Sequence, residues 1–298
     1  MISIAMATYN GGLYLQKQLD SIRTQTLSDI EIIICDDCSS DDTWNILQRN
    51  AALDLRIRCI RNEVNLGFKK NFEKAITLCT GEFIALSDQD DIWLPDHLEH
   101  LLSVVGNRDI ACGDAELIDE ENHCIHQRLS ERDGMDFCPD NGFDIAYRIF
   151  FNSSCFQGAS MLIRRNFLKK ALPIPECVKY HDAWFSALSC FCGGLRYSSK
   201  VITFHRRHLS NASHALHWKK ILCIHFRKAP ALTDRHEWAR FILERCPDLD
   251  KRKKDFLCSV FRFYDRNSRK GERMLNEFFR IRHYSSVYTT HSKIYIER

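Results

Sequence analysis

The chain has 298 residues, of which 45% are hydrophobic and 11% aromatic, and its formal net charge is only +3. This composition is typical of a globular protein and excludes a disordered chain. The length suits one large domain or one domain with an appendage. No stretch approaches the roughly 18 consecutive apolar residues that a membrane-spanning helix needs. The amino terminus lacks the pattern of a signal peptide, so we expect a cytoplasmic protein.

The fourteen cysteines are scattered along the chain, many of them in apolar surroundings. Cys35 and Cys38 have C-x-x-C spacing, but no second pair of this kind exists to complete a zinc site. A chain of this length does not need disulfides to be stable. We therefore expect free thiols in a reducing compartment.

Charge is distributed unevenly between the two parts of the chain. Residues 1–214 contain 22 Lys and Arg against 29 Asp and Glu, whereas residues 215–298 contain 20 against 10. A basic segment can contact nucleic acid, an anionic membrane or a phosphorylated acceptor, or it can simply be a solvated helical surface. Because no known nucleic-acid module occurs, we expect no nucleic-acid partner and instead peripheral contact with an anionic membrane surface.

Short apolar runs alternate with helical patterns through the first part of the chain. Four predicted strands are each followed by apolar residues at helical spacing, which predicts a parallel sheet with helices on both faces. These strands lie at residues 2–7, 31–35, 56–61 and 83–87. Further strands are predicted at 110–114, 156–163 and 201–205, with a polar excursion at 119–145, a helix from residue 180, and basic amphipathic helices after 215.

A polar cluster follows each of the first four predicted strands. The clusters are Thr8–Asn10, Asp36–Asp37, Asn62–Gly67 and Asp88–Asp91. In a parallel sheet, ligands bind outside the carboxyl ends of the strands. We therefore expect the four clusters to converge on one edge, although they are spread over 80 residues of sequence.

Three carboxylates follow the fourth strand, at Asp88, Asp90 and Asp91. A protein core cannot absorb them unless something neutralises their charge. Mg²⁺ and Mn²⁺ bind carboxylate oxygens and keep positions open for phosphates, so Asp88 and Asp90 are candidate ligands of a metal–diphosphate site. His208 is a candidate further ligand or a donor to phosphate. The alternative is that Asp91 or Asp88 caps the helix that Pro95 introduces.

Two other carboxylate positions are candidates for chemistry. Asp36 or Asp37 can accept hydrogen bonds from a base or from ribose hydroxyls, and the alternative is an Asx turn. Asp182 lies at a predicted helix start, where it is either a general base facing the cleft or an amino-terminal cap.

Taken in order, these motifs resemble the family 2 inverting glycosyltransferases with the GT-A fold. The likeness is strongest to the bacterial rhamnosyltransferase-like branch that builds O-antigen and capsule, and it covers residues 1–212. Its motifs are Ala7–Asn10, Asp36–Asp41, Asn62–Gly67, Lys70–Asn71, Ser87–Trp93, Gly158, His181–Asp182 and the run from Arg206 through His208 to Asn211. Ala7 stands where the family commonly has Pro, and Cys38 where Gly or Asn is usual.

The resemblance implies an α/β fold of GT-A type, with a Rossmann-like, mostly parallel sheet and flanking helices. We expect a nucleotide-binding half at 1–118, an acceptor-side half at 119–212, and a basic helical region at 213–298. Asp182 would be the catalytic base, and Asp88, Asp90 and His208 would hold Mn²⁺ or Mg²⁺. The expected donor-binding residues are Thr8, Tyr9, Asn10, Asp36, Asp37, Asn65, Lys70 and Asp88.

The implied activity is metal-dependent transfer of a sugar, with inversion, from a UDP- or dTDP-linked donor to a hydroxyl of a bacterial surface glycan. The acceptor could be lipid-linked, and the enzyme could work at the inner face of the cell membrane. Two alternatives stay open. One is a catalytically silent nucleotide-sugar-binding scaffold, and the other is a nucleotidyltransferase, although Asn10-Gly11-Gly12 is a poor substitute for the Gly-rich phosphate loop of that class. The donor sugar, acceptor, linkage and oligomeric state stay undetermined.

Overall fold

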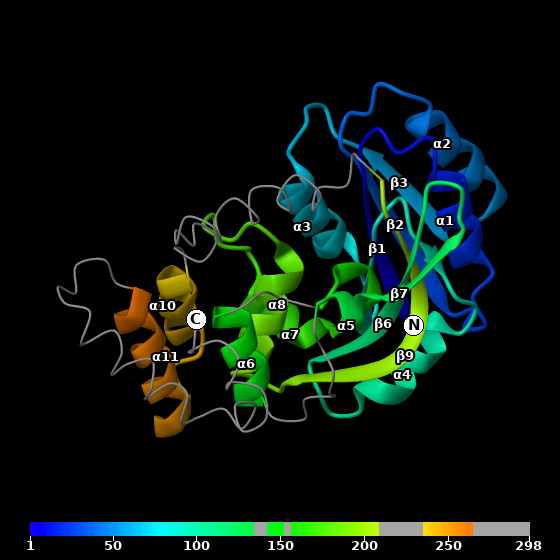
Figure 1. The fold of residues 1–298 in the computed structure, drawn as a ribbon. Coiled ribbons are helices and arrows are strands. Elements are labelled where there is room, and N and C mark those ends of the chain that lie inside the picture. The colour runs from blue at the N-terminus through cyan, green and yellow to red at the C-terminus, as the bar shows by residue number, and fades with distance from the viewer. Residues whose placement is uncertain (134–141, 152–155, 209–234, 265–298) are drawn as a thin grey trace, which may run out of the picture.

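The computed structural model describes residues 1–133, 142–151, 156–208 and 235–264 (Figure 1). The strands are β1 (Ile2–Thr8), β2 (Ile30–Asp36), β3 (Ile57–Arg61), β4 (Phe83–Ser87), β5 (Ile92–Trp93), β6 (Ile110–Ile118), β7 (Cys124–Arg128), β8 (Met161–Arg164) and β9 (Leu195–Arg206). The first helices are α1 (Leu15–Arg23), α2 (Thr43–Leu53), α3 (Phe68–Leu78), α4 (His97–Val105), α5 (Leu129–Arg132) and α6 (Gly142–Phe151). They are followed by the short 3₁₀ helix η1 (Gly158–Ser160), α7 (Arg165–Ala171), α8 (His181–Ser189), α10 (Arg235–Arg245) and α11 (Lys251–Tyr264).

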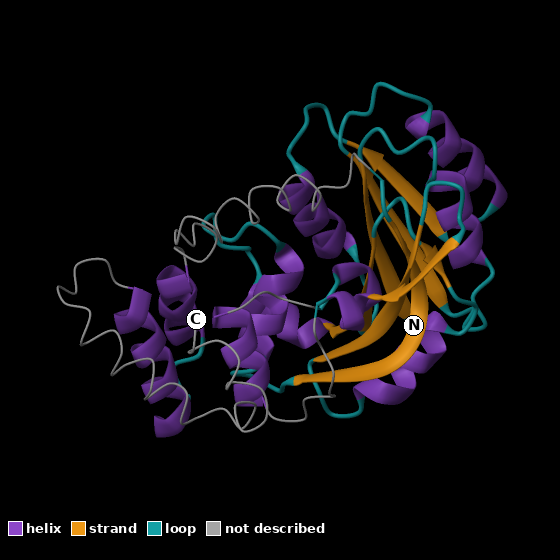
Figure 2. Ribbon diagram, in the orientation of Figure 1, coloured by secondary structure: helices purple, strands orange, loops and turns teal. Residues whose placement is uncertain are grey.

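One mixed sheet forms the centre of the body, with strand order β3-β2-β1-β4-β8-β6-β9-β5 and β7 paired to β6. The pairs among β1, β2, β3 and β4 are parallel, as the alternation of strands and helices predicts. β8 is antiparallel to both of its neighbours, while β6 and β9 are parallel to each other. Figure 2 shows the long, curved β9 running along the sheet and helices on either side of it.

Both faces of the sheet are buried, because successive side chains of each central strand point to opposite faces. In β2, Ile32 and Ile34 belong to an apolar cluster with α1, α2 and α4, and Ile33 and Cys35 belong to another with α3, α6 and α8. This two-sided burial explains why the predicted strands are continuous apolar runs.

α10 and α11 belong to the second of these apolar clusters. Trp238 of α10 packs edge to face on Trp184 of α8, with ring centroids 6.2 Å apart, and Phe256 of α11 is fully buried. The guanidinium of Arg245 donates to the carbonyl oxygens of Ala171 and Pro173. The domain boundary expected after residue 212 falls outside the described residues and stays a prediction, as do the helical patterns near 221 and 275.

Two parts of the chain differ from the sequence expectation. The polar excursion at 119–145 contains β7, whose five residues are all exposed, so it lacks the alternation that would predict a strand. Ile92 and Trp93 do not lead directly into a helix but form β5, which pairs with β9 through Ile92 and Phe204.

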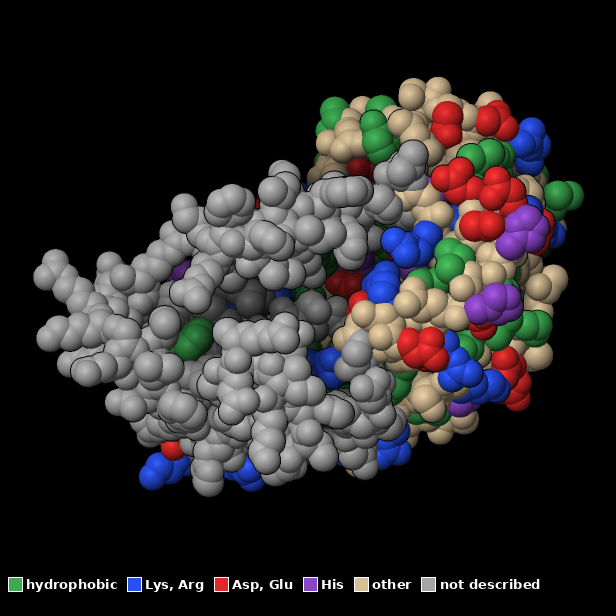
Figure 3. Space-filling model, in the orientation of Figure 1, with side chains coloured by type: hydrophobic (Ala, Val, Ile, Leu, Met, Phe, Trp, Pro, Cys, Tyr) green, Lys and Arg blue, Asp and Glu red, His purple; other side chains and the backbone are tan. Residues whose placement is uncertain are grey.

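Charge is also unevenly distributed on the face shown in Figure 3, where acidic side chains gather over the upper right of the body and Lys and Arg lie nearer the middle and lower edge. Within the described residues, no helix is both long and apolar enough to cross a membrane.

Candidate active site

The three acidic residues after β4 lie in the short loop 88–91, between β4 and β5, which we call the acidic loop. Asp91 is fully buried in this loop, and its Oδ1 lies 2.9 Å from His205 Nδ1 and accepts a hydrogen bond from the Arg206 backbone N–H at 3.1 Å. The alternative that Asp91 or Asp88 caps the following helix is wrong, because α4 begins at His97 with Asp96 as its N-cap residue. Asp91 instead joins the acidic loop to the end of β9.

Asp88 and Asp90 are half-buried, so part of each side chain is open to solvent. Asp90 Oδ2 lies 2.7 Å from His208 Nε2, which brings two of the three expected metal ligands into contact. Removal from water raises the pKa of Asp88 well above its ordinary value, and the negative charges of Asp91 and Asp90 raise it further while His205 opposes them. A Cβ atom added to Gly158 would lie 3.7 Å from Leu86 Cδ1 of β4 and 3.6 Å from Asp182 Cβ, so the expected base lies near the strand that leads into the acidic loop.

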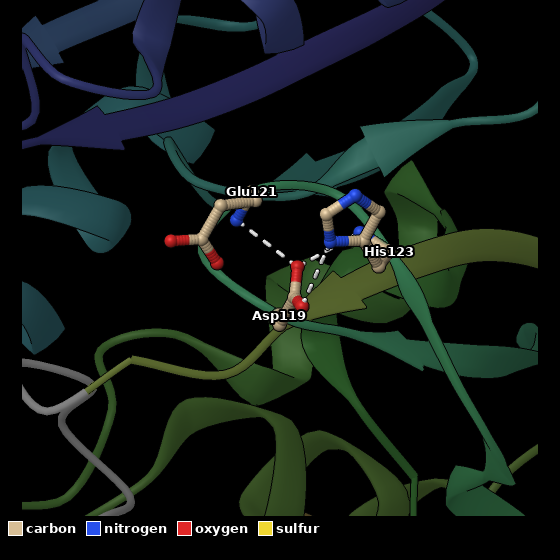
Figure 4. Close-up of side chains that lie close together, drawn as sticks. All are labelled: Asp119, Glu121 and His123. Carbon is tan, nitrogen blue, oxygen red and sulfur yellow. Dashed lines mark hydrogen bonds and ion pairs between the residues drawn. The ribbon is translucent and has the colours of Figure 1, made fainter.

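These donors fit a hard divalent cation. Carboxylate oxygens are the ligands that Mg²⁺ and Mn²⁺ prefer, and a cation would relieve the repulsion that raises the pKa of Asp88. Within the described residues, the ligand atoms of Asp88, Asp90 and His208 do not all lie within 4.8 Å of one another, whereas those of the three residues in Figure 4 do.

The group in Figure 4 is Asp119, Glu121 and His123, whose possible ligand atoms lie within 4.8 Å of one another. The Asp119 carboxylate accepts the backbone N–H groups of Glu121 and His123, at 3.0 and 2.8 Å, so it shapes the turn between β6 and β7. Glu121 and His123 are exposed. The hydrogen bonds that shape this turn therefore explain why the three side chains lie close together.

Asp36 and Asp37, expected to contact the nucleotide, are both buried at the end of β2. Asp36 accepts hydrogen bonds from the Thr8 hydroxyl at 3.1 Å and from the Ser39 backbone N–H at 3.1 Å. Asp37 accepts the backbone N–H groups of Leu66 and Gly67, at 2.7 and 2.9 Å. Both carboxylates therefore fix the loops around the expected nucleotide site, and their part in base or ribose recognition stays a prediction.

Tyr9 and Asn10 are exposed just beyond the end of β1. The Tyr9 backbone N–H donates to Gln89 Oε1 at 2.8 Å, and Gln89 Nε2 donates to the Tyr9 carbonyl at 3.1 Å. Asn10 Oδ1 accepts the Ser40 backbone N–H at 2.9 Å. The clusters after β1, β2 and β4 are thus joined by direct hydrogen bonds, as convergence on one edge requires.

The two remaining expected donor contacts lie at the start of α3. Asn65 Nδ2 donates to the Asp37 carbonyl at 3.2 Å, and its Oδ1 accepts the Gly67 N–H at 3.0 Å. Lys70 is exposed and pairs with Glu176 at 3.1 Å, beside a hollow of about 400 Å³ between α3 and residues 173–176. Asn65 therefore lies with the loops of the site, whereas the contact that the structure gives Lys70 is with Glu176.

Asp182 lies in the first turn of α8 and is half-buried. The N-cap residue of this helix is Tyr180, so Asp182 does not occupy the cap position that the alternative gives it. Its Oδ1 accepts the Ala183 backbone N–H at 2.6 Å. A Cβ atom added to Gly158 would lie 3.6 Å from Asp182 Cβ, so the backbone before β8 passes close to the expected base.

The sequence predicts no role for Gln89, which lies in the acidic loop, or for Gln157, His205 and Arg206, which contact that loop. Gln157 Nε2 lies 3.4 Å from Asp91 Oδ2, and Arg206 Nε donates to the Asp90 carbonyl at 2.9 Å. Arg206 and His205 stand at the end of a predicted strand, and a charged group there is a usable signal because it needs a partner if it is buried. Nothing in the sequence indicates that the partner is the acidic loop.

Comparison with known proteins identifies the family. The family model for glycosyl transferase family 2 matches residues 3–172, which include the acidic loop and every expected donor contact. The chain belongs to glycosyltransferase family 2. A protein of Nostoc sp. described as an uncharacterized glycosyltransferase is 29% identical over 219 residues, covering 70% of this chain and 66% of the relative.

A second relative has a named activity. UDP-Glc:alpha-D-GlcNAc-diphosphoundecaprenol beta-1,3-glucosyltransferase WfaP of Escherichia coli is 40% identical over 94 residues, covering 32% of this family 2 chain and 37% of WfaP. The matched parts thus span less than two thirds of the length of these curated relatives.

Solved structures show the same fold. S. aureus TarS (residues 1–349) in complex with UDP-GlcNAc superimposes with a TM-score of 0.61 at 18% identity, covering 95% of this chain and 81% of that one. The mannosyltransferase PcManGT of Pyrobaculum calidifontis, in complex with GDP-Man and Mn²⁺, gives a TM-score of 0.54 at 14% identity, covering 94% and 86%. The predictions of a family 2 glycosyltransferase and of a GT-A fold are confirmed.

Proposed function

We propose that this family 2 chain transfers a sugar, with inversion, from a nucleotide-diphosphate donor to a hydroxyl of a bacterial surface glycan. The observation that supports this most strongly is the gathering of Asp88, Asp90 and Asp182 at the carboxyl end of β4. These groups come from positions up to 94 residues apart in the numbering, and Asp182 Cβ and Leu86 Cδ1 of β4 would both lie within 3.7 Å of a Cβ atom added to Gly158. A leaving diphosphate and an acceptor hydroxyl need such groups on opposite sides of one anomeric carbon.

Asp88 and Asp90 would hold the metal, with His208 as a further ligand or a donor to phosphate. When bound, Mn²⁺ or Mg²⁺ supplies positive charge that stabilises the departing diphosphate. The site has the donor chemistry for this, since two half-buried carboxylates and an imidazole lie around the acidic loop. PcManGT was solved with Mn²⁺, which is consistent with a metal in a related fold.

Asp182 would remove the proton from the acceptor hydroxyl as its oxygen attacks the anomeric carbon. The new bond joins that oxygen to the carbon, while the bond from the carbon to the diphosphate oxygen breaks and the diphosphate leaves with the electron pair. One such displacement inverts the configuration. Asp182 is suited to this because it is half-buried, so its carboxylate can be reached, and its Oδ1 is oriented by the Ala183 N–H.

The nucleotide would lie against the loops after β1, β2 and β3, at Thr8, Tyr9, Asn10, Asp36, Asp37 and Asn65, with Lys70 as an outer contact. A UDP- or dTDP-linked donor is favoured because TarS structures contain UDP and UDP-GlcNAc and WfaP is named for a UDP-Glc donor. The name of WfaP also supports a lipid-linked glycan as acceptor. Contact with the inner face of the membrane is part of the same proposal.

The decisive test is transfer by the Asp182→Asn variant, assayed as nucleotide release with a panel of UDP- and dTDP-sugars and lipid-linked acceptors. Asparagine cannot accept the proton, so we expect kcat to fall at least about 100-fold. Donor binding, measured as a rise in Tm on adding the diphosphate with Mn²⁺, should persist. The matched control is Asp96→Asn, at the N-cap of α4, which should leave transfer unchanged. Wild-type turnover by Asp182→Asn would refute the base assignment, and full activity in excess chelator would refute the metal role.

A further inference from the structure

Arg206, the last residue of β9, is fully buried, and it is among the largest side chains with no exposed surface in the described residues. Burying a guanidinium is costly unless its N–H groups find acceptors. The acceptors therefore show what the residue holds together.

The donors of Arg206 bind two separate segments. Nε donates to the carbonyl of Asp90 in the acidic loop at 2.9 Å. Nη1 donates to the carbonyls of Asp119 and Glu120 at 2.9 and 3.2 Å, and Nη2 donates to Asn122 Oδ1 at 2.7 Å. The planar guanidinium of Arg206 thus connects the acidic loop to the turn between β6 and β7 through hydrogen bonds.

Arg206 makes two further contacts, one with Asp91 of the acidic loop and one with the Tyr14 ring. Its backbone N–H donates to Asp91 Oδ1. Its guanidinium lies over the Tyr14 ring, with Cζ 4.6 Å from the centroid, and the same ring lies 5.0 Å from the His208 ring. Tyr14 therefore supports both Arg206 and the histidine that contacts Asp90.

We propose that Arg206 is a positioning residue that fixes the Asp90 backbone, and with it the Asp88 and Asp90 carboxylates, for the donor diphosphate and its cation. The proposal rests on the proposed function, because it assumes that the acidic loop binds that group. A residue that orients a metal-binding group in this way is typically worth about 10- to 100-fold in metal affinity. Arg206 does not itself touch the reacting atoms in this proposal.

Arg206→Lys tests this geometry, because lysine keeps the charge but cannot donate to both segments from a planar fork. Arg245→Lys is a matched control, since Arg245 also donates to three carbonyls, those of Lys170, Ala171 and Pro173, and lies over an aromatic ring, that of Trp184. Both variants should lose thermal stability. Only Arg206→Lys should lose affinity for the diphosphate and cation.

The measurement is the Tm of each purified full-length protein titrated with Mn²⁺ alone and with UDP, dTDP or GDP plus Mn²⁺, followed by the KM and kcat for the donor that turns over. We expect Arg206→Lys to need about 10- to 100-fold more Mn²⁺ for the half-maximal shift, while Arg245→Lys matches wild type. An unchanged midpoint in Arg206→Lys would overturn the inference. If no diphosphate shifts the wild-type protein, the proposed function itself fails, so the two failures are distinguishable.

A milder variant covers the outcome in which Arg206→Lys does not fold. Asn122 has a positive φ of 77°, a conformation that glycine accepts, so Asn122→Gly removes the bond to Nη2 without backbone strain. His126→Gly is the control, because His126 also has a positive φ, of 55°, and lies in the neighbouring β7. A weaker Mn²⁺ midpoint in Asn122→Gly alone would support the inference, and equal midpoints in the two variants would overturn it.

Discussion

Gly158 lies where the chain passes the start of α8, and its missing side chain leaves room for His181. A Cβ atom at this position would lie only 3.0 Å from His181 Nε2 and 3.7 Å from Leu86 Cδ1. His181 is buried and precedes Asp182, so any displacement of its ring moves the first turn of the helix that presents the expected base. The close approach of the His181 ring to the backbone therefore explains why position 158 is a glycine.

Gly158→Ala should lower kcat about 10-fold while leaving the KM for the donor nearly unchanged, because it shifts the base and not the acidic loop. Steady-state kinetics with varied donor would measure both values. Gly142→Ala is the control, since a Cβ there would meet the Cys190 carbonyl at an ordinary 3.4 Å near the other end of α8. A rise in donor KM with unchanged kcat would contradict this prediction.

The ion pair of His205 with Asp91 gives the site a dependence on pH. Burial disfavours the charged imidazole of His205, but the charge of Asp91 and its hydrogen bond outweigh burial and raise the pKa of His205 above 6.5. The folded protein thus binds this proton more tightly than the unfolded chain does. The stability that the pair contributes is fully present below about pH 6.5 and is lost as the pH rises through the folded pKa.

We therefore expect the Tm of wild type to fall by a few degrees more than that of His205→Gln between pH 6.5 and pH 9. Differential scanning fluorimetry in matched buffers would measure the two curves. His97→Gln serves as the control of opposite sign. Burial lowers the pKa of His97 to about 3, so the wild-type residue reduces the stability of the fold only as the pH falls below 6.5. Parallel curves for wild type and His205→Gln above pH 6.5 would show that the ion pair does not contribute.

Among the elements, the strands and helices of the nucleotide half were predictable because apolar runs alternate with helical spacing over short distances. The convergence of the clusters after β1, β2 and β4 was predictable for the same reason, since parallel strands end at one edge. The contacts that organise the acidic loop were not. His205 lies 114 residues from its partner Asp91, and periodicity carries no information about such a pair. β5, with two residues, is too short to give a pattern.

The attachment of α10 to the body includes a pair of thiols. Cys192, after α8, and Cys246, after α10, have their Sγ atoms 3.5 Å apart although they are 54 residues apart in the chain. The neighbouring Cys192 thiol lowers the pKa of Cys246, to about 7. A thiolate is the form that reacts with an oxidant, so among the cysteines that the structure describes this pair is the one most ready to form a disulfide.

Treatment with diamide should join Cys192 to Cys246, as the two thiols give up two protons and two electrons to the reagent. Closing this loop should stabilise the fold by up to about 4 kcal/mol in the chain-entropy account. Peptide mapping and a Tm that rises with diamide and returns with dithiothreitol would measure it. Cys192→Ser should not respond, and a wild-type Tm that does not change while the bridge is present by mass would contradict the expected gain.

At the scale of the whole molecule, the sheet separates two kinds of packing. α1, α2 and α4 cover one face, and α3, α6 and α8 cover the other, with α10 and α11 stacked outside α8. The acidic loop and Asp182 lie where the second face meets the carboxyl ends of the strands. The sequence could indicate a basic helical region after residue 213, but not which of its helices pack on the body, because their apolar residues are compatible with either a core or a membrane surface.

The basic start of α11 is the described feature most suited to an anionic membrane. Lys251, Arg252 and Lys254 are exposed there, and each basic residue near such a surface contributes about 1 kcal/mol. Lys251→Gln combined with Lys254→Gln should therefore reduce co-sedimentation with phosphatidylglycerol vesicles roughly 10-fold or more at low salt. Lys169→Gln with Lys170→Gln, at the end of α7, removes the same charge from another exposed site and should have a smaller effect. Binding that ignores both salt and anionic lipid content would contradict an electrostatic attachment.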